Sequence, residues 1–122
     1  MWRLKTKWFN RWAKKNAIVD SNLNSAIDSI KLSSKRANLG GCLFKVRIAR
    51  RGKGTRVGFR TLIVLEKEKK SFFVYGFAKN EKSNISRLEL KYFKKLASDL
   101  LKLDDAQIMD MVRKSELFFL EE

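Results

Sequence analysis

Positively charged side chains occur at alternating positions in one segment and continue through the segment after it. The stretch FKVRIARRGKGTRVGFR, residues 44–60, contains seven Lys or Arg and no Asp or Glu. Its first part alternates hydrophobic residues with Lys45 and Arg47, which is the period-2 pattern of a half-buried strand. Strand geometry places these two side chains on one face, about 6.5 to 7 Å apart. That spacing suits two adjacent phosphates, or two oxygens of one reacting phosphate.

A third basic residue, Arg60, opens the next predicted strand and is placed to point into the same concave face. The segment between the two strands contains several glycines and is predicted to be a flexible loop. It does not match GxxxxGK[ST], so it is not predicted to be a nucleotide-binding P-loop. Its basic residues would line the rim and contact phosphates: Arg50, Arg51, Lys53 and Arg56. A solvated outer face is the alternative interpretation, but such a face usually mixes charges of both signs. Residues 29–65 contain no acidic residue, which favours contact with nucleic acid.

The charge of the whole chain points the same way. It has 28 Lys and Arg against 13 Asp and Glu, a net charge of +15, which indicates a polyanionic partner. Residues 99–122 reverse the sign, with seven acidic and three basic residues. We expect a basic working surface and a differently charged C-terminal end.

Two absences restrict the chemistry. The chain has no His, so a Ser-His or Cys-His nucleophile pair is excluded and the commonest zinc ligand is missing. The single cysteine, Cys42, cannot form an intramolecular disulfide. We therefore expect no metal site and no cofactor.

The elements that would position these residues are predicted from hydrophobic periodicity and capping residues. The predicted strands span 2–5, 42–48, 59–66 and 71–78, and the predicted helices span 7–16, 20–32, 83–103 and 105–114. Residues 38–41 are predicted to be a turn, and 117–122 an edge strand or docking segment. The order indicates an α+β fold, with an N-terminal helical hairpin packed on a small antiparallel sheet and followed by C-terminal helices.

The length is that of one domain, residues 1–122, in which 104–122 form an acidic C-terminal extension. No apolar run approaches the roughly 20 residues of a membrane span, and the first residues lack the apolar core of a signal peptide. We expect a cytoplasmic protein without a membrane partner.

Three segments in succession, GGCLFKVRIA, GFRTLIVLE and FFVYGFAKNEKSNIS, carry a family resemblance. Together they resemble the RelE/ParE superfamily of type II toxin–antitoxin toxins, and most closely the RelE-type branch with a YGFAKNE signature. The resemblance runs from KTKWF to about Leu103. It implies a RelE-like fold, endonucleolytic cutting of mRNA, usually on the ribosome, and silencing by a cognate antitoxin protein.

The resemblance also implies roles for individual residues. Lys45 and Arg47 occupy the positions of the family's paired basic residues, Arg60 that of the arginine opening the following strand, and Lys79 that of the lysine after the last strand. The chain departs from the RelE archetype at Asn80 and Ser86, where the archetype has an arginine and a tyrosine. Tyr75 or Lys79 is the candidate substitute for those side chains.

RNA cleavage without a metal needs a base for the 2′-hydroxyl, cations around the phosphate, and an acid for the leaving oxygen. In a site without His, a lysine crowded by other cations is the credible base, because like charges lower the pKa of a lysine. We assign this role to Lys45, phosphate binding to Arg47 and Arg60, and the acid to Lys79 or Tyr75. Two alternatives stay open: a ParE-type gyrase inhibitor, and a nucleic-acid-binding protein without catalysis.

Overall fold

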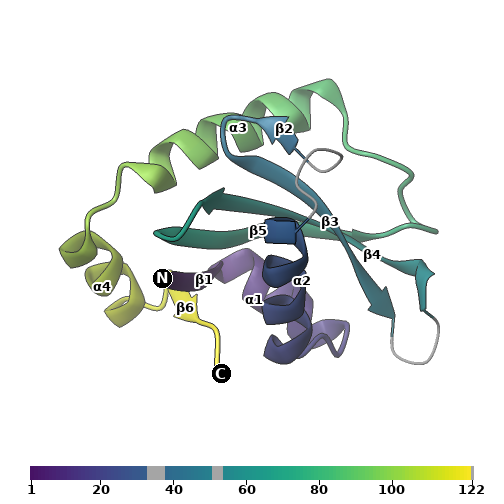
Figure 1. The fold of residues 1–122 in the computed structure, drawn as a ribbon, viewed down its shortest axis with the longest axis horizontal. Coiled ribbons are helices and arrows are strands. Elements are labelled where there is room, and N and C mark those ends of the chain that lie inside the picture. Colours follow the sequence, from purple (N-terminus) through teal and green to yellow (C-terminus); the bar gives the residue numbers. More distant parts are fainter. Residues whose placement is uncertain (33–37, 51–53, 122) are drawn as a thin grey trace.

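The computed structural model describes residues 1–32, 38–50 and 54–121, and it has the predicted α+β architecture (Figure 1). The elements follow one another in the order β1 (Trp2–Thr6), α1 (Lys7–Lys15), α2 (Asp20–Leu32), β2 (Asn38–Gly40), β3 (Leu43–Arg50), β4 (Gly54–Glu66), β5 (Lys70–Ala78), α3 (Arg87–Leu101), α4 (Asp105–Arg113) and β6 (Leu117–Phe119). None of the helices in the described ranges is both long and apolar enough to cross a membrane.

The strands form one sheet in the order β2-β3-β4-β5-β1-β6. The predicted antiparallel pairing of three consecutive strands is confirmed for β3, β4 and β5, and β6 pairs at the edge with β1. The prediction of a wholly antiparallel sheet is wrong, because β1 pairs parallel with β5. The chain also starts with this strand, so the helical hairpin is not its first element.

Strand β1 takes an interior place because both of its faces find partners. Leu4 is buried in the hydrophobic core on one face of the sheet. On the other face the ammonium group of Lys5, itself buried, donates to the carboxylate of Asp20 at the start of α2, at 2.7 Å. The pairing of opposite charges allows a lysine to be buried there.

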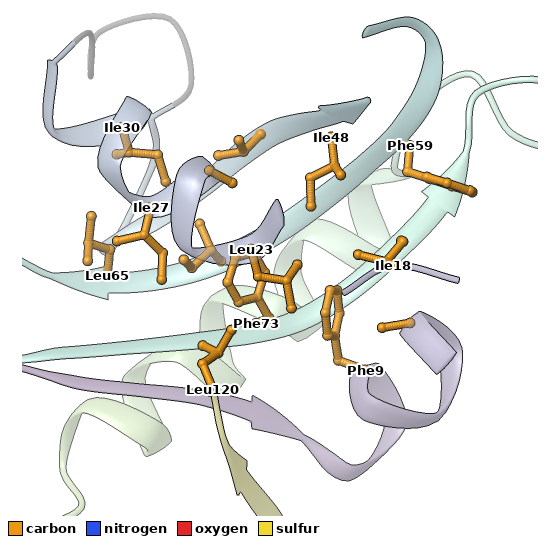
Figure 2. Close-up of a cluster of buried hydrophobic side chains, with 14 of the residues drawn as sticks. Phe9, Ile18, Leu23, Ile27, Ile30, Ile48, Phe59, Leu65, Phe73 and Leu120 are labelled. Atoms are coloured by element: carbon orange, nitrogen blue, oxygen red, sulfur yellow. The ribbon is translucent and has the colours of Figure 1, made fainter. Parts of the chain in front are cut away.

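Helices α1 and α2 cover one face of the sheet, where their apolar side chains meet those of the three central strands (Figure 2). Thr6 caps α1 as predicted, its hydroxyl accepting from the backbone N–H of Phe9. The side chains of this core that Figure 2 labels are Phe9, Ile18, Leu23, Ile27, Ile30, Ile48, Phe59, Leu65, Phe73 and Leu120. This core occupies one face of β3 and β4, so the alternating residues of these strands project from the opposite face.

Helix α3 runs along the opposite side of the sheet, and α4 continues it toward β6 (Figure 1). The second core lies here and includes Leu43, Leu62 and Val64 of the strands, and Phe93 and Leu100 of α3. Residues that alternate with the first core along β3 and β4 therefore face α3.

Three predicted boundaries differ from the structure. Residues 38–40 form the short strand β2 rather than a turn, and the chain reverses only at Gly41 and Cys42, both with positive φ. Strand β4 begins at Gly54, so the second part of the predicted basic loop is strand. Helix α3 begins at Arg87 rather than at residue 83, because Ser86 and Glu89 form a capping box that fixes its start.

Candidate functional site

The three basic residues singled out from the sequence share the face of the sheet that α3 covers. Arg47 lies directly opposite Arg60 in the β3–β4 pairing, and Lys45 lies opposite Leu62. Val46 and Ile48, which alternate with them, are buried in the core on the other side. We call Lys45, Arg47 and Arg60 the basic face.

Arg60 is a buried cation, and none of the ion pairs found among the described residues involves it. Only 7% of its surface is exposed, and its Nη1 atom has no hydrogen-bond partner in the part of the chain that the structure describes. Burial, and secondarily the charge of Arg47, lower the pKa of Arg60. Because an unpaired buried charge is costly, this geometry favours the binding of an anion beside Arg60.

The loop after β5 reaches over the basic face. The side-chain oxygen of Asn84 accepts a hydrogen bond from the Lys45 ammonium at 3.3 Å. Arg47 is exposed. The basic face thus combines one buried cation, one exposed cation, and one lysine held by the neighbouring loop.

A β-bulge in β5 turns Tyr75 toward α3. Leu62 pairs with Tyr75 but Ile63 pairs with Phe73, so Val74 is an extra residue in β5. The Tyr75 ring consequently packs against Phe93 of α3, at 4.8 Å between ring centroids. Without this shift of register, Tyr75 would lie on the face that α1 and α2 cover.

The hydroxyl of Tyr75 belongs to a cluster with Lys82 and Glu89, which we call the tyrosine cluster. The hydroxyl donates to Glu89 Oε2 at 3.3 Å and accepts from Lys82 Nζ at 3.4 Å, and Lys82 forms an ion pair with Glu89. Lys82 Nζ also lies 5.9 Å from the centre of the Phe77 ring. Phe77 pairs with Arg60 across the sheet, so it joins the tyrosine cluster to the basic face.

The ion pair fixes the charges in this cluster. The hydrogen bond from Lys82, followed by that from the backbone N–H of Ser86, lowers the pKa of Glu89 to about 2. The hydrogen bond to Glu89 raises the pKa of Lys82. Near neutral pH, Glu89 is a carboxylate that accepts from the Tyr75 hydroxyl and from the Lys82 ammonium, and Lys82 is a cation.

The other predicted site residues are less well placed. Lys79 is exposed just after β5, and none of the interactions found among the described residues involves it. Arg50 ends β3 and Arg56 lies in β4, whereas Arg51 and Lys53 lie outside the described residues. The structure therefore brings together Lys45, Arg47 and Arg60, with Tyr75 close by.

Lys82 and Glu89 were missed by reasoning from the sequence. The spacing S-x-x-E at residues 86–89 was available as a capping-box signal. It predicts the helix start but not that the second carboxylate oxygen of Glu89 bonds a lysine and a tyrosine. The same box explains one departure from the archetype, because Ser86 serves as the N-cap of α3.

A comparison with protein-family models identifies a match over most of the chain. The model described as "RelE toxin of RelE / RelB toxin-antitoxin system" covers residues 1–119. The chain belongs to the RelE toxin family. A comparison with curated proteins found no match.

Membership of the RelE family identifies the chain as the toxin of a toxin–antitoxin system, with an antitoxin as its partner. Among the described residues, no group of three or more His, Cys, Asp or Glu side chains is placed to hold a metal ion.

Proposed function

We propose that this RelE-family toxin is an endoribonuclease that cuts mRNA held on the ribosome, and so inhibits translation. The observation that carries the proposal is the buried guanidinium of Arg60 beside Arg47, since its Nη1 has no hydrogen-bond partner among the described residues. A phosphodiester with a developing second negative charge is the ligand that such a pair of cations stabilises best.

The reaction needs no group beyond the chain's own residues. The amine of Lys45 takes the proton of the 2′-hydroxyl, and the resulting oxygen attacks the neighbouring phosphorus. The bond from phosphorus to the 5′-oxygen breaks, which leaves a 2′,3′-cyclic phosphate and a 5′-hydroxyl. Arg47 and Arg60 stabilise the charge on the phosphate oxygens during this exchange.

The leaving 5′-oxygen takes its proton from an acid, for which Tyr75 and Lys79 are the candidates. The structure favours Tyr75, because its hydroxyl lies on the same side of the sheet as Arg60 and is bonded to Lys82. The RelE archetype has a positively charged arginine at the position of Asn80. In this chain Lys82 supplies a positive charge beside Tyr75 instead. The ribosome would supply the positioning of the RNA strand.

The test is cell-free translation with the purified chain, in which new mRNA ends are mapped by primer extension. We expect new ends at the ribosomal A site with the wild type, and at least about a 100-fold lower rate of cutting with Lys45→Ala. The matched control is Lys67→Ala, which removes an exposed lysine in the turn between β4 and β5 and should leave cutting unchanged.

Intact mRNA with the wild-type chain would contradict the proposal. Inhibition of DNA gyrase in a supercoiling assay would then support a ParE-type toxin. Salt-dependent RNA binding without either activity would support a nucleic-acid-binding protein without catalysis.

A further inference from the structure

The tyrosine cluster lies within reach of the basic face. Arg60 pairs with Phe77, and Tyr75 lies two residues before Phe77 on the same face of β5. Arg60 and Tyr75 are therefore diagonal neighbours, with Cα atoms about 7–8 Å apart, a separation that long side chains can bridge. Lys45 and Tyr75 both pair with Leu62, from opposite sides of β4. A phosphate bound at Arg60 on β4 thus has Lys45 on one flanking strand and Tyr75 on the other.

The ring of Tyr75 is held in place by aromatic packing. Its centroid lies 4.8 Å from that of Phe93 and 5.0 Å from that of Trp8. The ring of Phe77 follows at 5.9 Å. This packing fixes the position of the phenolic oxygen, while the O–H bond can still rotate about the C–O bond.

The phenolic oxygen has one cation and one carboxylate beside it. It accepts from Lys82 Nζ at 3.4 Å and donates to Glu89 Oε2 at 3.3 Å, and Lys82 forms an ion pair with the same carboxylate. The other oxygen of Glu89 accepts from the backbone N–H of Ser86 at 2.8 Å, so the capping box of α3 fixes the carboxylate. The side chains of Lys82 and Glu89 are 30% and 27% exposed, which leaves the cluster accessible to an RNA oxygen.

We propose that Lys82 is a positioning residue that makes Tyr75 an effective acid, and that Glu89 holds Lys82 for this role. When Tyr75 gives up its proton, its oxygen becomes negatively charged, and a cation already fixed beside that oxygen stabilises the charge without reorganisation. Glu89 without Lys82 would have the opposite effect, because a carboxylate disfavours a second negative charge nearby. The inference rests on the proposed function, since it assigns a residue to the protonation of the leaving oxygen.

The proton transfer balances within the chain, the RNA and solvent. The O–H of Tyr75 turns from Glu89 to the leaving 5′-oxygen. The bond from phosphorus to that oxygen breaks, its electron pair stays on the oxygen, and the proton of Tyr75 bonds to it. Lys82 keeps its protons throughout. When the products have left, the phenolate takes a proton from solvent, and Lys45 releases to solvent the proton of the 2′-hydroxyl.

A purely structural connection between β5 and α3 is the competing interpretation of these contacts. The two interpretations differ in what the leaving group requires. A structural connection supports cutting whatever the leaving group is, whereas a residue that acts through the acid matters only when the leaving group needs a proton.

The test compares two synthetic mRNAs on ribosomes, cut in a single turnover at saturating toxin. The two differ only at the linkage that the wild type cuts, where sulfur replaces the bridging 5′-oxygen in one of them. A thiolate leaves without protonation, because the pKa of a thiol lies far below that of an alcohol. The sulfur mRNA therefore makes the acid dispensable, and its cutting also reports that a variant is folded.

We expect Lys82→Met to cut the oxygen mRNA about 100-fold more slowly than the wild type, and the sulfur mRNA at the wild-type rate. Lys82→Arg keeps a cation and should retain most of the rate on the oxygen mRNA. Tyr75→Phe should show the same pattern as Lys82→Met. The double variant should be no slower than Tyr75→Phe, because a residue that acts through Tyr75 contributes nothing without it.

Two controls accompany these variants. Lys95→Met removes the lysine of an exposed ion pair elsewhere on α3 and should cut both mRNAs as the wild type does. Lys45→Ala should be slow on both mRNAs, because the base is needed with either leaving group.

Equal slowing of both mRNAs by Lys82→Met would overturn the inference, and so would wild-type cutting of the oxygen mRNA by this variant. A double variant much slower than Tyr75→Phe would also overturn it, because Lys82 would then act independently of Tyr75. The proposed function would stand in all three cases. If the wild type cut neither mRNA, both proposals would be overturned.

Discussion

The guanidinium of Arg60 is buried beside a second cation, and no carboxylate of the described residues forms an ion pair with it. Leu62 and Val64, the next residues of β4 on the same face, are apolar and lie in the core with α3. A residue that lowers the stability of the free protein is typical of a binding site, where ligand binding offsets the loss. We interpret Arg60 as present for the phosphate.

This interpretation predicts the effect of Arg60→Met on stability. Methionine fills a similar volume without a charge, so the free energy of unfolding should rise by about 1 kcal/mol or more. Urea denaturation at low ionic strength measures this change. Arg47→Met removes an exposed charge and should change the stability by less than about 0.5 kcal/mol. A loss of stability in Arg60→Met would show that the guanidinium supports the fold.

A second prediction concerns the pH dependence of the Glu89 carboxylate. The folded-state pKa of about 2 lies below the ordinary value of 4.5, so the charged form stabilises the fold. That contribution is fully present above about pH 4.5 and is lost as the pH falls through about 2. Glu89→Gln keeps a capping-box side chain but removes the charge.

We therefore expect Glu89→Gln to be less stable than the wild type at pH 7, and the difference to shrink steadily between pH 4.5 and 2. Thermal unfolding at a series of pH values measures it. Asp99→Asn is the control, because Asp99 pairs with Lys95 on the exposed side of the same helix and should give a smaller difference. A difference that does not depend on pH would show that the ion pair with Lys82 does not lower the pKa of Glu89.

The end of helix α3 is held by a lysine from the sheet. Lys70 at the start of β5 donates to the backbone carbonyl of Leu101 at 3.3 Å and also to that of Leu103. The carbonyl of Leu101 belongs to the last turn of α3 and that of Leu103 lies just beyond it, where the helix has no partners of its own and where a positive charge is favourable. Helix α3 carries Glu89 and Phe93, which contact Tyr75, so the contact with Lys70 helps to position the tyrosine cluster.

Lys70→Met should lower the free energy of unfolding by about 1–2 kcal/mol, because two partly buried carbonyls lose their donor. The neighbouring Lys69 is exposed in the turn, so Lys69→Met is the matched control and should have little effect. Urea denaturation of both variants measures the difference. Equal stabilities would show that water replaces the lysine without cost.

Elements with a local signal in the sequence could be predicted, and those fixed by distant partners could not. The Thr6 cap and the alternation of β3 depend on residues within a few positions of each other. The parallel pairing of β1 with β5 joins residues nearly 70 positions apart, and no local pattern encodes it. The bulge at Val74 is likewise a property of two strands together.

The same distinction applies to the candidate site of the molecule as a whole. The basic face could be predicted because alternation along β3 puts Lys45 and Arg47 on one side, with Arg60 opposite Arg47. The tyrosine cluster could not, because it joins β5, the loop after β5 and α3 through the side chains of Tyr75, Lys82 and Glu89. The unpaired state of Arg60 also becomes visible only when its surroundings are known.

The net charge of +15 is concentrated in the N-terminal and central parts of the chain, while residues 99–122 are acidic. The acidic end forms α4 and β6, and β6 pairs with β1 on the side of the sheet away from β3. The basic face is therefore not neutralised by the chain's own acidic segment.

The most direct test of the account measures mRNA cutting and folding on the same preparation of Arg60→Met. The account predicts a variant at least as stable as the wild type by urea denaturation that yields no new mRNA ends in cell-free translation. Such a result would separate the role of the guanidinium from that of the fold. Wild-type cutting by a folded Arg60→Met would contradict the account, because the buried cation would then have no part in the reaction.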